Sequence, residues 1–176
     1  IVMWASAIVM AIPVTVANGS FEEPALSDGD VVGYGGGGST IPSWQSTGAG
    51  ISAQYLQVRD PDSAYPLQAT DGENHAFLSG GINMWQDLGA IQDETIYTVT
   101  VDLGAHNAVS PAYAWSDFQF YGGTSHSNLL KSVRFGDPGG GNTEIPTDGF
   151  SSFSMSWDSS GSSFVGQNIR LNFQSD

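Results

Sequence analysis

The feature that most constrains the fold is a series of short β-type segments divided by clusters of glycine, proline, serine and aspartate. No stretch shows the three- and four-residue apolar spacing of an amphipathic helix, whereas Ile96–Leu103 alternates as a half-buried strand does. Further strands are predicted at Val14–Val16, Ile51–Val58, His75–Leu78, Asn83–Leu88, Ala114–Phe120, Leu129–Phe135, Ser151–Trp157 and Asn168–Phe173. The loop from Asp28 to Thr40, with its run of glycines, is predicted to be irregular. About nine short strands predict an all-β sandwich or barrel.

The apolar segment of residues 1–13 stands apart from the rest of the chain. It is compatible with the tail of a signal peptide, although it has no positive charge before it. A membrane span is opposed by its length and by Pro13. The third interpretation is an apolar strand that is buried in this domain or in a neighbouring copy, with the contacts made by Val2, Trp4, Ile8, Val9 and Ile12. Residues 14–176 are predicted to form a single β-sandwich domain, without internal repeat or linker.

The charge balance excludes several partners. Among 176 residues there are 18 Asp and Glu but only 4 Lys and Arg, a formal net charge of −14. Nucleic acid needs a basic stripe, which four scattered cations cannot form. Polyanionic sugars and anionic membranes are disfavoured for the same reason. The absence of cysteine removes disulfides, thiolate metal sites and thiol nucleophiles. Only 12% of residues are charged, and a surface of small polar groups and carboxylates predicts a secreted or cell-surface protein.

Two groups of motifs resemble a known fold family. The first is Asn18-Gly19-Ser20-Phe21-Glu22-Glu23-Pro24, followed by Ile41-Pro42-Ser43-Trp44. The second comprises Asp71–Leu78, Trp85–Leu88 and Thr95–Val101. Together they resemble the galactose-binding-like jelly rolls, which include carbohydrate-binding modules and exported bacterial proteins with PEP-CTERM sorting signals. The resemblance covers roughly Val14 to Gly104 and implies an antiparallel jelly-roll β-sandwich, with a structural Ca²⁺ and glycan binding.

Two departures from that family bear on function. Such domains close with a strand that this chain does not reach before Asp176, and an apolar segment precedes the usual start. A missing strand leaves an exposed sheet edge, which proteins normally cover. The N-terminal segment fills that place in the same chain or in a neighbour, and in the second case subunits join head to tail.

Calcium ligands are predicted from the resemblance. The family places a metal-binding carboxylate at the position of Glu22, and Asp71 and Glu73 in the following loop are weaker candidates. Hard cations take several oxygen ligands from flexible loops, which suits these residues. The alternative is that Glu22 is a solvated carboxylate of a turn.

Sugar binding needs exposed aromatic rings. Tyr113 and Trp115 share one face if their segment is extended, and Tyr34 in the glycine-rich loop is a third candidate. Trp44 and Trp85 occupy motif positions where the family packs a core residue, so we interpret both as core.

Catalysis is not predicted. The three histidines are scattered, no serine-nucleophile elbow is present, and the glycine run lacks the lysine of a phosphate loop. Two hypotheses follow. One is a non-catalytic module that binds a neutral polysaccharide or cell-surface glycan and holds a structural Ca²⁺. The other is a subunit of an extracellular filament or surface layer that self-associates through its apolar N-terminal strand.

Overall fold

The computed structural model describes residues 14–34, 40–47, 56–61, 69–105, 115–123, 125–136, 144–147 and 149–175. Within them the regular secondary structure is entirely β, with no helix. In chain order the strands are β1 (Val31–Gly33), β2 (Gln45–Thr47), β3 (Leu56–Arg59), β4 (His75–Leu78), β5 (Asn83–Ala90), β6 (Ile96–Leu103), β7 (Trp115–Gly122), β8 (Asn128–Gly136), β9 (Ser151–Asp158) and β10 (Asn168–Ser175). No described helix is therefore available that could cross a membrane.

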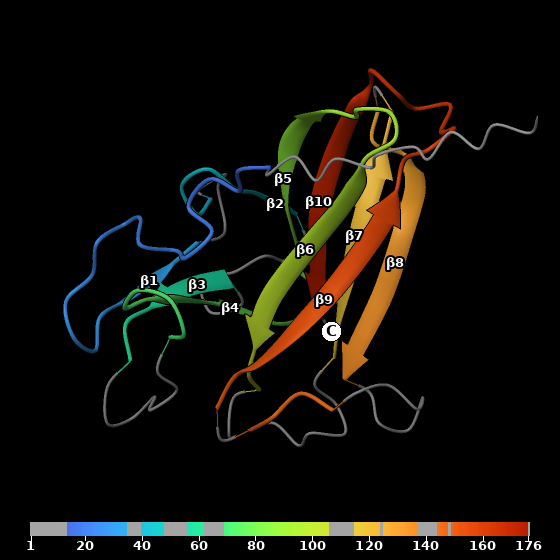
Figure 1. The fold of residues 1–176 in the computed structure, drawn as a ribbon. Helices are drawn as coiled ribbons and strands as arrows, with labels where there is room; N and C mark the ends of the chain where they lie inside the picture. Colours follow the sequence, from blue (N-terminus) through green and yellow to red (C-terminus); the bar gives the residue numbers. More distant parts are fainter. Residues whose placement is uncertain are drawn as a thin grey trace, which may run out of the picture.

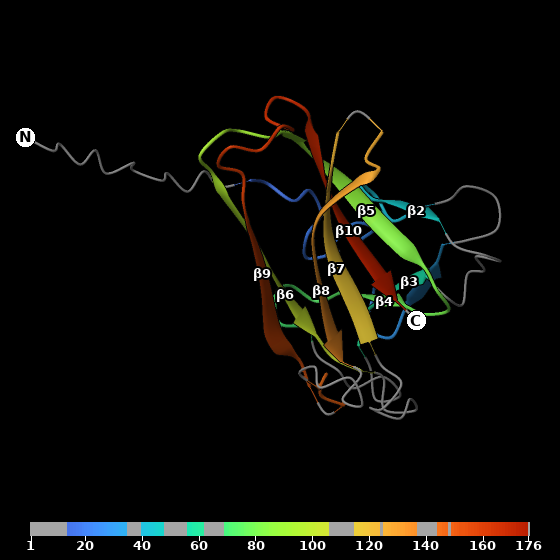
Figure 2. The same cartoon turned by 90° about the vertical axis from the view of Figure 1, so that its right-hand side faces the viewer.

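The strands form three antiparallel sheets. Five of them make the largest sheet in the order β2-β5-β10-β7-β8, β6 pairs with β9, and a small sheet has the order β1-β3-β4. In Figure 1 the β6–β9 pair lies in front of the five-stranded sheet, and the small sheet lies to one side. Figure 2 shows the two layers facing each other. The arrangement is an antiparallel β-sandwich, as the strand pattern predicted.

Aromatic side chains join the two layers. The ring of Tyr97 on β6 lies 6.5 Å from that of Phe120 on β7. The ring of Phe153 on β9 lies 4.8 Å from that of Phe135 on β8. These contacts belong to one core cluster, which also includes Leu56 of β3 in the small sheet. Trp44, only 2% exposed, belongs to it and confirms its interpretation as a core residue.

Most predicted strands are confirmed within two residues at each end. The segments predicted at His75–Leu78 and Ile96–Leu103 coincide with β4 and β6. The prediction of an irregular Asp28–Thr40 loop is wrong in part, because Val31–Gly33 pairs with β3. A three-residue strand followed directly by glycines has too few alternating positions to be recognised in the sequence.

The strand predicted at Val14–Val16 is absent, and a side chain explains how the chain is held there. The amide of Gln86 on β5 accepts a hydrogen bond from the Ala17 N–H and donates one to the Ala17 carbonyl. It also donates to the carbonyl of Ser43. The buried amide of Gln86 therefore takes the hydrogen bonds of these backbone N–H and C=O groups, as a neighbouring strand would in a sheet.

Candidate functional site

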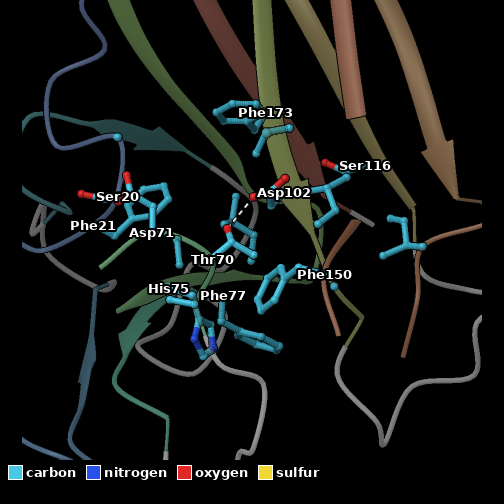
Figure 3. A pocket seen from close by; sticks show the side chains of 18 of the residues that line it. Ser20, Phe21, Thr70, Asp71, His75, Phe77, Asp102, Ser116, Phe150 and Phe173 are labelled. Carbon is cyan, nitrogen blue, oxygen red and sulfur yellow. Dashed lines mark hydrogen bonds between the residues drawn. The ribbon is translucent and has the colours of Figure 1, made fainter. Parts of the chain in front are cut away.

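A cavity of about 530 Å³ lies at one end of the sandwich. Its wall comes from the end of β6, the start of β9, the start of β7 and the end of β10, with β4 and its preceding loop closing one side. Figure 3 shows labelled side chains around it from segments far apart in the sequence. The volume is that of a site for a small molecule.

The wall is mainly aromatic and aliphatic. Five phenylalanines line it, and they come from the loop before the small sheet, from β4, β7 and β10, and from the turn before β9: Phe21, Phe77, Phe118, Phe150 and Phe173. Met84, Val101 and Ile145 add aliphatic surface. Such a wall excludes water from much of an apolar ligand and presents ring faces to it.

Asp102 is the carboxylate held most firmly in this wall. It is in register with Ser152 across the β6–β9 pair, and the Ser152 hydroxyl donates to its Oδ1. The hydroxyl of Thr70 donates to its Oδ2 from the loop before β4. The dashed line in Figure 3 marks the second of these bonds. Both carboxylate oxygens are thus held by hydroxyl groups from separate segments.

Those hydrogen bonds favour the ionised form of the Asp102 carboxyl. Donation from Ser152, and then from Thr70, lowers the pKa of the Asp102 carboxyl, while partial burial opposes the shift. Asp102 is therefore ionised at neutral pH. Because its pKa is lower in the folded chain, its contribution to stability is present above the ordinary pKa and is lost as the pH falls through the folded value.

The charges around the cavity are otherwise few. Asp71 is the second carboxylate among the described lining residues, and it is exposed. None of the four Lys and Arg side chains of the chain lines the described cavity wall. Arg59 is stacked on the ring of Phe77, 4.2 Å from its centroid, without being part of the wall. The site therefore favours a neutral or cationic ligand over an anion.

The predicted calcium ligand Glu22 lies under the loop that contains Asp71 and Glu73. Its Oε1 accepts hydrogen bonds from the backbone N–H groups of Glu73 and Asn74, both at 2.9 Å. A Cβ on Gly72 would lie 2.2 Å from that oxygen, so only glycine permits this approach, and its φ of +73° is also left-handed. The structure thus brings the three predicted residues to one place, with Glu22 held by the backbone.

A second acidic group lies at the adjoining edge of the small sheet. Asp60 directly follows β3 and Asn74 directly precedes β4, so the antiparallel pairing puts both at the same end of these two strands. Asp60 is buried, and burial raises the pKa of its carboxyl, with Asp28, Glu22 and Asp30 raising it further. Asn74 Oδ1 is buried and has no hydrogen-bond partner among the described residues. No described group of three or more Asp, Glu, His or Cys side chains converges on a metal position.

The residues predicted to bind sugar are not gathered by the described structure. Tyr34 is 7% exposed and packs in the core. Tyr113 lies outside the described residues, and Trp115 begins β7 with a side chain that is not described. Trp85 is half-buried on β5 rather than in the core cluster, and the guanidinium of Arg170 lies 5.0 Å from its ring.

The predicted assembly residues Val2, Trp4, Ile8, Val9 and Ile12 also lie outside the described residues. The division into an apolar segment of residues 1–13 and a domain of residues 14–176 stays a prediction.

Comparison with known proteins gives one family. The model of the family described as "HpiC1-like: HpiC1 cyclase" matches residues 12–176. Among curated proteins, no sequence relative matches the chain.

Solved structures of cyclases share the fold. A Stig cyclase, Fisc, from Fischerella sp. TAU, in complex with (3Z)-3-(1-methyl-2-pyrrolidinylidene)-3H-indole, is 18% identical over 95% of each chain, with a TM-score of 0.72. A cyclase from Fischerella sp. TAU, in complex with 4-(1H-indol-3-yl)butan-2-one, is 21% identical over 94% of each chain, with a TM-score of 0.65. At these identities the likeness shows the fold.

The family match overturns several predictions. The assignment to the galactose-binding-like carbohydrate modules is wrong, because the matched family is one of cyclases. Three further predictions are wrong for the same reason: the non-catalytic glycan-binding function, the polysaccharide partner, and the alternative of a filament or surface-layer subunit. The motifs that carried the resemblance lie at strands and turns, such as β6 and the Glu22 loop, and these specify a sandwich rather than a ligand.

The cavity residues were not predicted as a site. Thr70, Asp102, Phe150 and Ser152 come from separate segments and form no local motif. The sequence carried one weak signal, since Asp102 is the charged residue at the end of a strand face that otherwise holds Ile96, Thr98 and Thr100. The two hydroxyls that bind Asp102 come from distant positions, so a search for local motifs does not find the group.

Proposed function

The chain belongs to the HpiC1-like cyclase family, and we propose that it is an enzyme that cyclises a small, largely apolar molecule in the cavity at the end of the sandwich. The observation that carries this proposal is the pairing of a wall of phenylalanines with one firmly held carboxylate, Asp102. A hydrocarbon chain or an aromatic ring suits such a wall, whereas a phosphate ester does not.

The chemistry of ring closure matches these groups. When one alkene carbon takes up a proton from solvent, its π pair forms the new C–H bond and the neighbouring carbon becomes cationic. A second unsaturated carbon then gives its π pair to that cation, so that one C–C σ bond forms, one π bond is lost, and the positive charge moves to the carbon beyond. The faces of the phenylalanine rings stabilise that charge through their quadrupoles. The ring is completed when the cation loses a proton to a base. The product then has the same composition as the substrate, because one proton is taken up and one is released.

Asp102 supplies the base and the counter-charge. Its lowered pKa keeps it ionised, so it can attract the developing cation and then accept the proton. Thr70 and Ser152 hold the carboxylate oxygens and thereby fix their direction. These two hydroxyls are positioning residues in this proposal.

The substrate class proposed is an indole that carries an unsaturated chain. The support is that two structurally similar cyclases were solved with indole compounds. The cavity volume suits such a molecule, and the absence of lysine and arginine from the described wall suits its lack of negative charge.

A cavity-filling variant tests the proposal. Ala76 on β4 lines the cavity, whereas Ala90 at the end of β5 is exposed. We expect Ala76→Phe to weaken binding of 4-(1H-indol-3-yl)butan-2-one at least about tenfold, because the added ring occupies the ligand's space. Ala90→Phe is the matched control and leaves binding unchanged. The measurement is isothermal titration calorimetry, with conversion of a 3-alkenylindole to an isomer followed by chromatography and NMR.

Equal binding by both variants would move the ligand site elsewhere. Binding without isomer formation by the wild-type protein, across a panel of alkenylindoles, would contradict the catalytic part of the proposal.

We also propose that calcium binds at the edge of the small sheet. Its ligands are Glu22 through the oxygen that the backbone does not bind, Asp60, and the unpartnered Oδ1 of Asn74. A buried carboxylate among like charges and an orphaned amide oxygen fit a hard cation that takes oxygen ligands. Asp71 and Glu73 remain weaker candidates. Calcium here joins the Glu22 loop to the small sheet, and so has a structural role.

Asp60→Asn tests the calcium proposal. Because the folded-state pKa of Asp60 is raised, the metal-free protein loses stability as the pH rises from the ordinary value through the folded value. We therefore expect Asp60→Asn to raise the metal-free Tm by a few degrees at pH 7 and to remove most of the stabilisation by 1 mM Ca²⁺. Glu144→Gln, an exposed acid outside the cluster, is the control. A wild-type Tm that does not respond to Ca²⁺ would refute the site.

Two further proposals concern the strand connections and the location of the protein. We propose that the strands are connected as in a jelly roll of the galactose-binding type, which the antiparallel sandwich supports. Secretion, predicted from the sparse surface charge, stays a proposal.

A further inference from the structure

Ser175 breaks the apolar pattern of the central strand β10. Alternate residues Ile169, Leu171 and Phe173 point into the core and are buried. The next residue on that face is Ser175, which is 7% exposed and lines the cavity. A hydroxyl therefore stands where the pattern calls for an apolar side chain.

The neighbouring strand breaks its pattern at the same level. β7 runs antiparallel to β10, and its inward residues, taken toward its start, are Phe120, Phe118 and then Ser116. Ser116 also lines the cavity. The register pairs Ser116 with Ser175, just as it pairs Phe118 with Phe173. Two adjacent strands thus change from aromatic or aliphatic residues to serine where the core becomes the cavity wall.

The two hydroxyls differ in what they bind. Ser116 Oγ donates to the carbonyl of Gln174 at 3.2 Å. Ser175 Oγ is buried and has no hydrogen-bond partner among the described residues. A buried hydroxyl without a partner destabilises a protein, so such groups are rare unless a ligand or water satisfies them. Ser175 is therefore available to bind something in the cavity.

The geometry points to Ser175 as a specificity-determining residue, whose hydroxyl donates a hydrogen bond to a carbonyl or similar acceptor of the ligand. This inference rests on the proposed function, since it concerns the same cavity. In a wall made largely of phenylalanine rings, one directional bond fixes which way the ligand lies relative to Asp102. The site then selects an indole with an acceptor on its side chain over the corresponding hydrocarbon.

The test compares two ligands of nearly equal size. 4-(1H-Indol-3-yl)butan-2-one carries a ketone oxygen, and 3-butylindole does not. We expect the wild-type protein to bind the ketone about five- to tenfold more tightly, as one net hydrogen bond allows. Ser175→Ala should remove that preference by weakening only the ketone. Ser175→Thr, which keeps a hydroxyl, should retain it, and Ser132→Ala, an exposed serine of β8 outside the cavity, should leave it unchanged.

Stability provides a second measurement. Because Ser175→Ala removes an unpartnered buried hydroxyl, we expect its Tm without ligand to equal or exceed that of the wild type. The proposal is overturned if the wild type binds both ligands equally, or if Ser175→Ala keeps the preference. If neither indole binds, both the proposed substrate class and the role of Ser175 are wrong. If both indoles bind with equal affinity, only the role of Ser175 is wrong.

Discussion

Asp102→Asn is expected to lower turnover of the cyclisation substrate by at least about 100-fold, while the folded protein is retained. General-base catalysis and charge stabilisation by one side chain contribute factors of this order. Asparagine has nearly the same shape, and its carbonyl oxygen still accepts one of the two hydrogen bonds from Thr70 and Ser152. It carries no charge and accepts no proton. Turnover is measured with saturating substrate, and folding is checked by circular dichroism.

Asp71→Asn is the matched control for that variant. Asp71 also lines the cavity, but it is exposed and its carboxyl has no described hydroxyl partners comparable to those of Asp102. We expect its turnover to stay within about threefold of wild type, because solvent screens an exposed carboxylate. If the two variants lose activity equally, general negative charge in the cavity matters and the assignment of the base to Asp102 is wrong.

Trp44→Ala is expected to have the largest effect on stability, about 3–5 kcal/mol, because it removes a buried ring from a close-packed core. The indole of Trp44 lies 5.8 Å from the ring of Phe21 and 5.6 Å from that of Phe173. Its Nε1–H donates to the carbonyl of Asn18 at 3.1 Å. The substitution therefore loses packing and one hydrogen bond to that carbonyl, which keeps the Phe21 N–H as a donor. The measurement is the free energy of unfolding in urea.

Trp85→Ala serves as the comparison. Trp85 is half-buried on β5, with Arg170 beside its ring, so its loss is expected to cost about 1 kcal/mol. Equal losses for the two tryptophans would contradict the described core. Because Phe21 and Phe173 both line the cavity, Trp44→Ala should also weaken ligand binding.

Much of the fold could be predicted from the sequence because long strands carry a repeated pattern. β6 alternates two faces over eight positions, with Thr98, Thr100 and Asp102 on the outer one, and its ends were correctly predicted. β1 has three residues, and the chain that follows Val14–Val16 is held at Ala17 by the Gln86 side chain rather than by a strand. Neither arrangement leaves a periodic trace in the sequence. Tertiary contacts decided both.

The site was less predictable because its parts meet only in the folded chain. Thr70 reaches Asp102 across 32 positions of sequence, and Ser152 reaches it across 50. The resemblance to carbohydrate modules predicted Glu22 as a metal ligand, and in the structure its carboxylate accepts hydrogen bonds from the loop at Glu73 and Asn74. It could not reveal the cavity, because loop and strand-end residues set the chemistry of a shared sandwich.

The position of β10 has a consequence for the growing polypeptide. β10 pairs with β5 on one side and β7 on the other, at residues 168–175. Until the ribosome has added those residues, β5 and β7 have no shared neighbour, and the apolar faces around Met84 and Phe118 lack their cover. The large sheet is therefore completed only after the other described strands have been synthesised. Until then the edges of β5 and β7 that β10 will occupy are open to pairing with strands of other chains.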